Sequence, residues 1–150
     1  MSNLTNVYIV DGARTAFGGF GQAFKQVSAT ELGVASAKAA LERAKVEASE
    51  VDQVIYGNVI PSSITAAYVA RHIALQTGIP VEVPALLVNR VCGSGLQSVI
   101  SGAQSIKLGE AGFVLAGGQR ICPKLHMLIL AVASALSSAV FSWRICFSIR

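Results

Sequence analysis

The feature that most constrains the fold of this chain is an alternation of short apolar runs with helical patterns. Apolar runs occupy residues 7–10, 51–60, 85–92 and 113–118, and each predicts a buried strand. Helical patterns fill the intervals at residues 28–46, 66–78 and 95–110. The resulting β-α-β-α-β-α-β order predicts an α/β fold, in which helices cover a mostly parallel sheet.

Capping and turn residues set the expected ends of these elements. Ser28 or Thr30 would cap the first helix, with Glu31 in its first turn, and Gly78 would end the second helix. The Asp-Gly pair after residue 10 predicts a turn, and Gly57 predicts a break in the second strand. The expected buried face of the third helix comprises Leu96, Val99, Ile100, Ala103 and Ile106.

The composition is apolar and the positive charge is unevenly distributed. Hydrophobic residues make up 53% of the chain and charged residues 13%, so we expect a partner or further chain to cover part of the surface. The formal net charge is +4, yet residues 1–118 carry eight basic and eight acidic side chains. The excess lies entirely in residues 119–150, and no basic stripe is interleaved with aromatic residues. This pattern gives nucleic-acid binding little support.

The three cysteines, Cys92, Cys122 and Cys146, are widely spaced and form no CxxC pair. That spacing indicates neither a metal site nor a disulfide framework, so we expect no metal and a reducing compartment. The N-terminal residues lack the basic and apolar regions of a secretory signal.

Cys92 is the strongest candidate for chemistry. It lies between a predicted strand and a predicted helix, where an α/β sheet presents reactive groups. The N–H groups and dipole of the following helix would favour a thiolate over a thiol. Gly93 and Gly95 would admit a bulky substrate and allow unusual backbone angles. From the local pattern alone, a buried and inert cysteine is an equally good interpretation.

Other candidates are weaker. His72 is interpreted as a packing residue of the second helix, because no carboxylate or cysteine stands at ligand spacing. The glycine-rich FGGFG segment lacks the lysine and Ser/Thr of a phosphate-binding loop, so it is interpreted as an ordinary loop. Arg14 is interpreted as a salt-bridged surface residue in preference to a contact with substrate or with a partner subunit.

Four segments resemble the N-terminal half of the thiolases. They are DGARTAFGGFG, ATELG, NRVCGSGLQSVISGAQSI and FVLAGG, in that order, and they extend from about residue 6 to residue 118. The pattern ARH…GIP…PAL..NR.CGSG.QS is most similar to the degradative 3-ketoacyl-CoA thiolases. The resemblance implies that residues 1–118 form an incomplete thiolase N-terminal domain, whose sheet stops at the fourth strand.

The resemblance also implies the chemistry. Cys92 would attack a 3-oxoacyl-CoA, release acetyl-CoA, and hold an acyl thioester that coenzyme A then removes. Coenzyme A would be a substrate, with no permanently bound cofactor and no coenzyme-binding residue assigned. Family members use a histidine and a second cysteine from their C-terminal half, and neither His72 nor His126 can be assigned that role. The family also implies a dimer or tetramer, and the mitochondrial matrix with the cytoplasm as alternative.

Two alternatives keep the family but change the function. The parent protein could be an acetoacetyl-CoA thiolase. These 150 residues could also be a non-catalytic truncated isoform that binds complete thiolase subunits. On its own, the chain is expected to lack thiolysis activity.

Residues 119–150 differ in character from the rest of the chain. All 14 glycines precede this segment, which also has no acidic residue. Residues 119–127, QRICPKLHM, back-translate as CAG AGA ATA TGT CCC AAG CTC CAC ATG. One preceding A and a shifted frame give Thr-Glu-Asn-Met-Ser-Gln-Ala-Pro-His, the run that follows FVLAGG in the family. We therefore expect residues 119–150 to be an out-of-frame product.

A membrane anchor is the alternative interpretation of the same segment. Residues 127–143 carry no charge and are flanked by Lys124 and Arg144. Their length is borderline for a helix that crosses a bilayer, and several serines weaken the interpretation. A membrane-bound protein is therefore the less favoured expectation.

Overall fold

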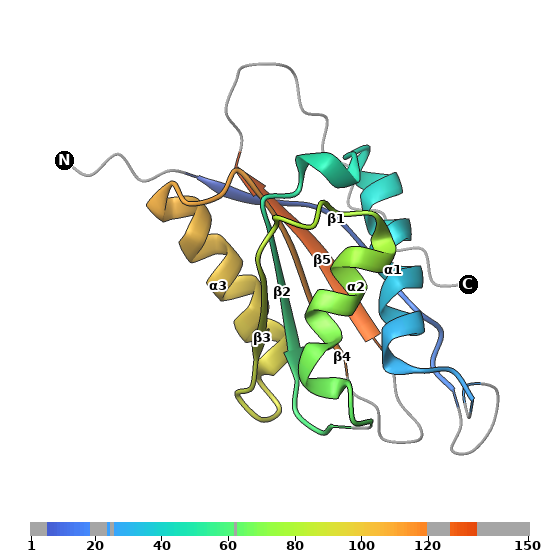
Figure 1. The fold of residues 1–150 in the computed structure, drawn as a ribbon. Helices are drawn as coiled ribbons and strands as arrows, with labels where there is room; N and C mark the ends of the chain where they lie inside the picture. The colour runs from blue at the N-terminus through green and yellow to red at the C-terminus, as the bar shows by residue number, and fades with distance from the viewer. Residues whose placement is uncertain (1–5, 19–23, 25, 62, 120–126, 135–150) are drawn as a thin grey trace.

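The computed structural model describes residues 6–18, 24, 26–61, 63–119 and 127–134, which form one sheet with helices on both faces (Figure 1). The strands lie in the order β1-β5-β4-β2-β3. The elements are β1 (Val7–Arg14), α1 (Ala29–Ala44), β2 (Gln53–Asn58), α2 (Val69–Thr77), β3 (Ala85–Val88), α3 (Ser94–Leu108), β4 (Phe113–Gln119) and β5 (Met127–Ser134). Short 3-10 helices span Ala48–Glu50 and Ala66–Tyr68.

The strand directions confirm the predicted α/β class. β2 pairs in parallel with both β3 and β4, while β5 pairs antiparallel with both β4 and β1. Four of the five strands therefore run in one direction. In Figure 1, α1 and α2 cover one face of the sheet and α3 covers the other.

The expectation that the sheet stops at its fourth strand is wrong. The sheet contains β5, which comes from the unusual C-terminal segment and lies between β1 and β4. A short apolar run with β-branched residues suits a strand bonded on both sides, because both neighbours satisfy its backbone polar groups. Within the described part of the chain, no helix is long and apolar enough to cross a membrane.

Two expected interruptions of strands are also wrong. The Asp11-Gly12 pair does not end β1, which continues to Arg14 with a register shift between Ile9 and Asp11. The extra residue at this shift is Val10, while Asp11 and Gly12 remain paired with β5. Gly57 does not break β2 either, since the strand continues to Asn58.

The helix ends agree better with the sequence. Ser28 caps α1, because its Oγ accepts the Glu31 N–H at 3.1 Å and Glu31 Oε2 accepts the Ser28 N–H at 2.7 Å. These bonds to Ser28 lower the pKa of the Glu31 carboxyl. Gly78 ends α2 in the left-handed conformation, with φ +94°. Both caps were predictable because they depend on neighbouring residues.

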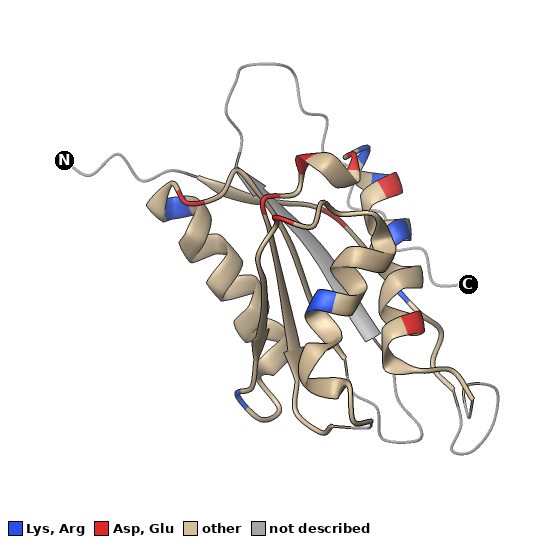
Figure 2. Ribbon diagram, in the orientation of Figure 1, with Lys and Arg blue, Asp and Glu red and all other residues tan. Residues whose placement is uncertain are grey.

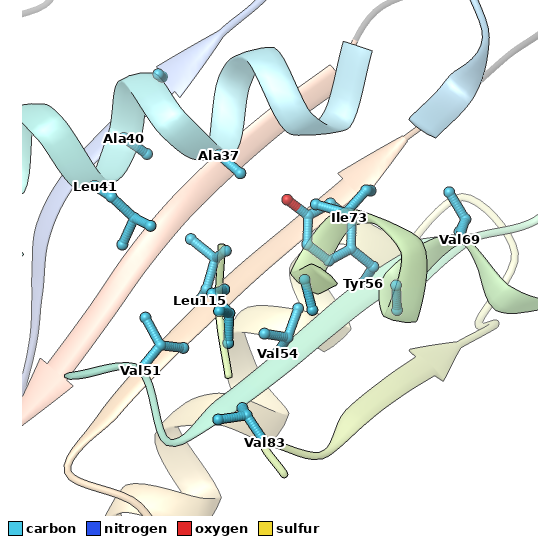
Figure 3. Packing of buried hydrophobic residues seen from close by; sticks show 14 of the residues in the cluster. Ala37, Ala40, Leu41, Val51, Val54, Tyr56, Val69, Ile73, Val83 and Leu115 are labelled. Atoms are coloured by element: carbon cyan, nitrogen blue, oxygen red, sulfur yellow. The ribbon is translucent and has the colours of Figure 1, made fainter. Parts of the chain in front are cut away.

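The face of the sheet under α1 and α2 holds the larger core. Tyr56, Ile73 and Leu115 are fully buried there, and Figure 3 shows them packed between the helices and the sheet. The Tyr56 hydroxyl has no hydrogen-bond partner within the described residues, and burial raises the pKa of Tyr56. Apolar side chains therefore fill the layer between this face of the sheet and helices α1 and α2.

Candidate active site

Cys92 lies in the turn that connects β3 to α3, and it is exposed. β3 ends at Val88, and α3 begins at Ser94 with Gly93 as its N-cap. The cysteine therefore stands at the carboxyl end of a parallel strand, directly before a helix N-terminus. This is the position that the sequence predicts for it, and its exposure disagrees with the interpretation as a buried, inert residue.

The face of α3 that packs on the sheet differs from the predicted one. The buried residues of this helix are Ser94, Ser98, Gly102 and Ile106. Leu96, predicted to be buried, is 65% exposed, and Ile100 is also exposed. Small residues spaced four apart let the helix approach the sheet closely, which a face of large apolar residues would prevent.

Two strand glycines make this close approach possible. A Cβ at Gly57 would lie 2.5 Å from the Ser94 carbonyl carbon and oxygen, and one at Gly118 would lie 2.6 Å from the Gly95 Cα. Both distances are shorter than the contacts that real Cβ atoms make, which are essentially never under 3.0 Å. The first turn of α3 therefore rests directly on the backbone of β2 and β4, which explains why the glycine in the middle of β2 does not interrupt that strand.

The hydroxyl of Ser98 attaches the same turn to β4. Its Oγ lies 2.7 Å from the carbonyl oxygens of both Gly95 and Gly117, and Ser98 is completely buried. The single hydroxyl proton is donated to one carbonyl at a time. Together with the glycine contacts, this bond fixes the start of α3 relative to the sheet.

The unusual backbone angle of the site lies at Val91, in contrast to the expectation for Gly93 and Gly95. Val91 has φ +51°, while Gly93 has φ −87°, which any residue adopts. The turn is closed by bonds from the Gly93 N–H to the Arg90 carbonyl and from the Ser94 N–H to the Val91 carbonyl, both at 3.1 Å. Glycine at position 93 is therefore not required by the backbone.

Charged groups are sparse around this turn. Figure 2 shows Lys, Arg, Asp and Glu spread over the helices and loops of the described chain. Arg90 stands two residues before the cysteine, and its Nη1 donates to Gln97 Oε1 at 3.1 Å. The Arg90 guanidinium is therefore held against α3.

The structure brings none of the other sequence candidates into contact with Cys92. The His72 ring lies 6.2 Å from the Tyr68 ring, which agrees with a packing role on α2. The Arg14 guanidinium lies 3.7 Å from the centre of the Phe17 ring, in place of the expected salt bridge. Most of the FGGFG loop, as well as Cys122, His126 and Cys146, falls outside the described residues. Among the described side chains, no cluster could hold a metal ion.

Sequence comparison now identifies the family. Residues 7–125 match the family described as "Thiolase, N-terminal domain". The chain belongs to the thiolase family. It is 50% identical over 118 residues to human mitochondrial 3-ketoacyl-CoA thiolase, and 46% identical over 116 residues to an acetyl-CoA acetyltransferase of Cupriavidus necator. These matches cover 79% and 77% of this chain but only 30% and 29% of the relatives, so the chain spans less than a third of their length.

Solved thiolase structures share this arrangement of strands and helices. The human mitochondrial 3-ketoacyl-CoA thiolase in complex with CoA has a TM-score of 0.74 at 50% identity, over 76% of this chain and 29% of that one. The acetyl-CoA acetyltransferase of Bacillus anthracis has a TM-score of 0.75 at 37% identity, over 81% of this chain and 30% of that one. Members of this family are acyltransferases, and Cys92 lies within the matched residues.

The sequence interpretation overlooked two residues of this site. Asn89 and Ser94 flank the cysteine and bond to the backbone of the turn, with Asn89 Oδ1 accepting the Val91 N–H at 3.1 Å. The only signal in the sequence was their position beside Cys92, since both residue types commonly bond to a nearby backbone.

Proposed function

We propose that this chain carries the nucleophile of a thiolase that cleaves 3-oxoacyl-CoA with coenzyme A. The Cys92 thiolate attacks the 3-keto carbon, and the bond between C2 and C3 breaks. The acetyl-CoA carbanion takes up a proton and leaves, so that the shortened acyl group remains on Cys92 as a thioester. Coenzyme A then attacks this thioester, and its acyl product is released as the Cys92 thiolate re-forms. No permanently bound cofactor takes part.

The observation that carries the proposal is the exposed Cys92 at the start of α3, inside the stretch that matches the family. An exposed sulfur can be reached by a bulky thioester, and a helix N-terminus stabilises the anionic form of a nearby group. The sheet positions this turn through the backbone contacts of Gly57 and Gly118.

On their own, these 150 residues are expected to give no measurable thiolysis. The proton transfers require an acid and a base near the sulfur. The one described histidine, His72, lies on α2, where its ring packs near that of Tyr68, whereas Cys92 precedes α3. Groups that stabilise the oxyanion contribute about 10²–10³ each in rate. Rapid turnover of acetoacetyl-CoA or a longer 3-oxoacyl-CoA by the purified chain would contradict this expectation.

Two further functions remain as alternatives. The 46% identity to an acetyl-CoA acetyltransferase favours an acetoacetyl-CoA thiolase as the second candidate parent. A non-catalytic isoform that binds complete thiolase subunits is the other, and co-purification with a full-length subunit would favour it. Several relatives are named as mitochondrial, which supports a mitochondrial location over a cytoplasmic one.

We also propose that a second thiolase subunit covers the outer side of α3. The exposed Leu86 of β3 and the exposed Leu96 and Ile100 of α3 give this part of the molecule an apolar surface. In the described sheet, β3 is an end strand with one unpaired edge. Such a surface commonly marks a protein interface, which supports the dimer or tetramer expected for the family.

Residues from Gln119 onward are proposed to be read out of frame. The Gln119 side chain is 6% exposed, and neither its amide nitrogen nor its oxygen has a hydrogen-bond partner in the described part of the chain. Burying a side-chain amide without a hydrogen bond destabilises the folded state. Such a defect is expected at the first residue of an altered reading frame, where the residue type is not matched to its surroundings. Sequencing the transcript and the genomic DNA across the codons for residues 117–127 tests this. A thiolase frame displaced by one base supports the proposal, and an unbroken frame as written contradicts it.

The proposed catalytic role can be tested in a chimera. Residues 7–118 would replace the matched segment of human mitochondrial 3-ketoacyl-CoA thiolase, and thiolysis would be measured with and without Cys92→Ser. We expect activity in the chimera and its loss in the variant. A folded, oligomeric chimera that is inactive, or one that stays active with serine at position 92, would overturn the proposal.

A further inference from the structure

The residue before the proposed nucleophile adopts a backbone conformation that its type disfavours. Val91 has φ +51°, in the left-handed region. A β-branched residue is rarely found there, because its Cβ crowds the backbone. Such a conformation persists only where the surroundings impose it, and it is often found at functional sites.

Two side chains hold the peptide groups on either side of Val91. Toward the N-terminus, Asn89 Oδ1 accepts the Val91 N–H at 3.1 Å. Toward the C-terminus, Ser94 Oγ donates to the Val91 carbonyl at 2.7 Å, and the same oxygen accepts the Arg90 N–H at 2.8 Å. Both polar groups of Val91 are thus bonded to side chains, one on the strand side of the turn and one on the first residue of α3.

The residues that follow the turn are attached to the sheet. The start of α3 is fixed to β4 by Ser98, and Gly57 and Gly118 leave no space between helix and sheet. The only short segment free to change between β3 and α3 is therefore the turn at residues 89–93. Within it, the angle at Val91 sets the direction in which the chain enters Cys92.

We propose that Asn89 and Ser94 form a clamp that imposes the left-handed conformation of Val91 and thereby directs Cys92 toward the N-terminus of α3. Both are positioning residues, since they act through the backbone of Val91. The inference rests on the proposed role of Cys92 as the nucleophile. It adds the residues that fix the backbone immediately before Cys92.

The size of the effect follows from the conformational preference of valine. Without the clamp, Val91 returns to right-handed or extended backbone in most molecules, and about 5- to 30-fold fewer molecules keep the turn. The reaction rate of Cys92 with a thiolate-selective reagent falls accordingly, with the rate of the urea-unfolded chain as its lower limit, because the sulfur is exposed with or without the turn. Because Cys92 is already exposed, loosening the turn does not raise the rate by uncovering the sulfur.

The experiment measures the rate of Cys92 alkylation by iodoacetamide at pH 7, by peptide mapping of the full 150-residue chain. The variants are Asn89→Ala and Ser94→Ala, each alone and combined with Val91→Gly. Asn89 is exposed, so its replacement does not disturb the core. Ser101→Ala is the matched control, because Ser101 is on the same helix and its hydroxyl accepts from Gln97 Nε2. Urea unfolding of each variant reports the stability separately.

We expect each single clamp variant to lose most of the excess of the native rate over the urea-unfolded rate, and Ser101→Ala to react at the rate of the unaltered chain. Adding Val91→Gly should restore most of this excess, because glycine adopts positive φ as readily as negative φ. A merely structural defect would not be repaired by a glycine at an exposed position. Unchanged rates in both single variants, or no recovery with Val91→Gly, would overturn the clamp.

The unaltered chain also separates this inference from the proposed function. If Cys92 reacts faster in the native chain than in the urea-unfolded chain, but the clamp variants match the native rate, only the clamp is wrong. If Cys92 reacts no faster in the native chain, the clamp is overturned, while the proposed nucleophile is contradicted only if the chimera stays active with Cys92→Ser.

Discussion

The two faces of the sheet differ in the size of their apolar cores and in how closely the helices approach the strands. Under α1 and α2, large residues such as Tyr56, Ile73 and Leu115 fill a thick apolar layer. Under α3, a smaller apolar cluster includes Ile55, Ile106 and Val114, and the first turn of the helix meets the strand glycines almost backbone to backbone. The first face provides most of the buried apolar surface, and the second fixes the position of one turn. Both faces therefore bury apolar side chains, but the close approach of helix to sheet that positions the turn is found on the α3 face.

The largest effect is expected on the α1/α2 face. Ile73 is completely buried on α2, and Ile73→Ala should reduce the free energy of unfolding by about 2–5 kcal/mol through lost burial and a cavity. Leu75→Ala on the same helix is the matched control, because Leu75 is 42% exposed and should change stability by roughly 0.5 kcal/mol at most. Urea unfolding of both variants measures this difference. Equal losses would contradict the assignment of this face as the core.

A smaller effect is expected where α3 meets the sheet. Gly118→Ala should cost about 1–3 kcal/mol, since its Cβ would lie 2.6 Å from the Gly95 Cα. The matched control is a substitution at Gly95, the residue on the helix side of the same contact. A Cβ at Gly95 would lie 3.8 Å from the Gly118 Cα, so Gly95→Ala should be neutral or stabilising. If the two variants unfold at the same urea concentration, the close approach of α3 is wrong.

The cap of α1 should contribute about 1 kcal/mol. Ser28→Ala removes the acceptor for the Glu31 N–H, while Thr30→Ala leaves the cap intact and should have little effect. The pKa of Glu31 is lowered in the folded chain, so its contribution is present above the unfolded pKa and disappears as the pH falls through the folded one. The stability difference between Ser28→Ala and the unaltered chain should therefore shrink in acid. A constant difference from pH 7 to pH 3 would contradict this.

The smallest effect is expected at Tyr56. Its buried hydroxyl has no partner among the described residues, so Tyr56→Phe should change stability by less than about 1 kcal/mol and should favour the folded state. Burial raises the pKa of Tyr56, and the unaltered chain should therefore lose stability as the pH rises above about 10, while the variant should lose less. A large destabilisation at neutral pH would reveal a hydrogen bond to the Tyr56 hydroxyl that the described residues do not provide.

The sequence predicted the features that depend on neighbouring residues. The helix limits at Ser28 and Gly78, the three parallel-paired strands and the place of Cys92 before α3 all follow from local patterns. Prediction from the sequence failed where residues far away in the chain determine the local structure. The buried side of α3 depends on glycines in β2 and β4, and the chain around residue 127 became a strand because β1 and β4 lie on either side of it. The left-handed Val91 could not be predicted, because valine is a poor indicator of positive φ.

The most direct test of the central claim is the alkylation rate of Cys92 in the folded chain relative to the urea-unfolded chain at the same pH. The cysteine is exposed in the fold, so the ratio reports the effect of the turn and of α3 on the sulfur, with little change in access. We expect Cys92 to react at least about threefold faster in the native chain, because the turn holds the residue beside the positive end of the α3 dipole. An equal or slower native rate would contradict the claim that this fold activates Cys92.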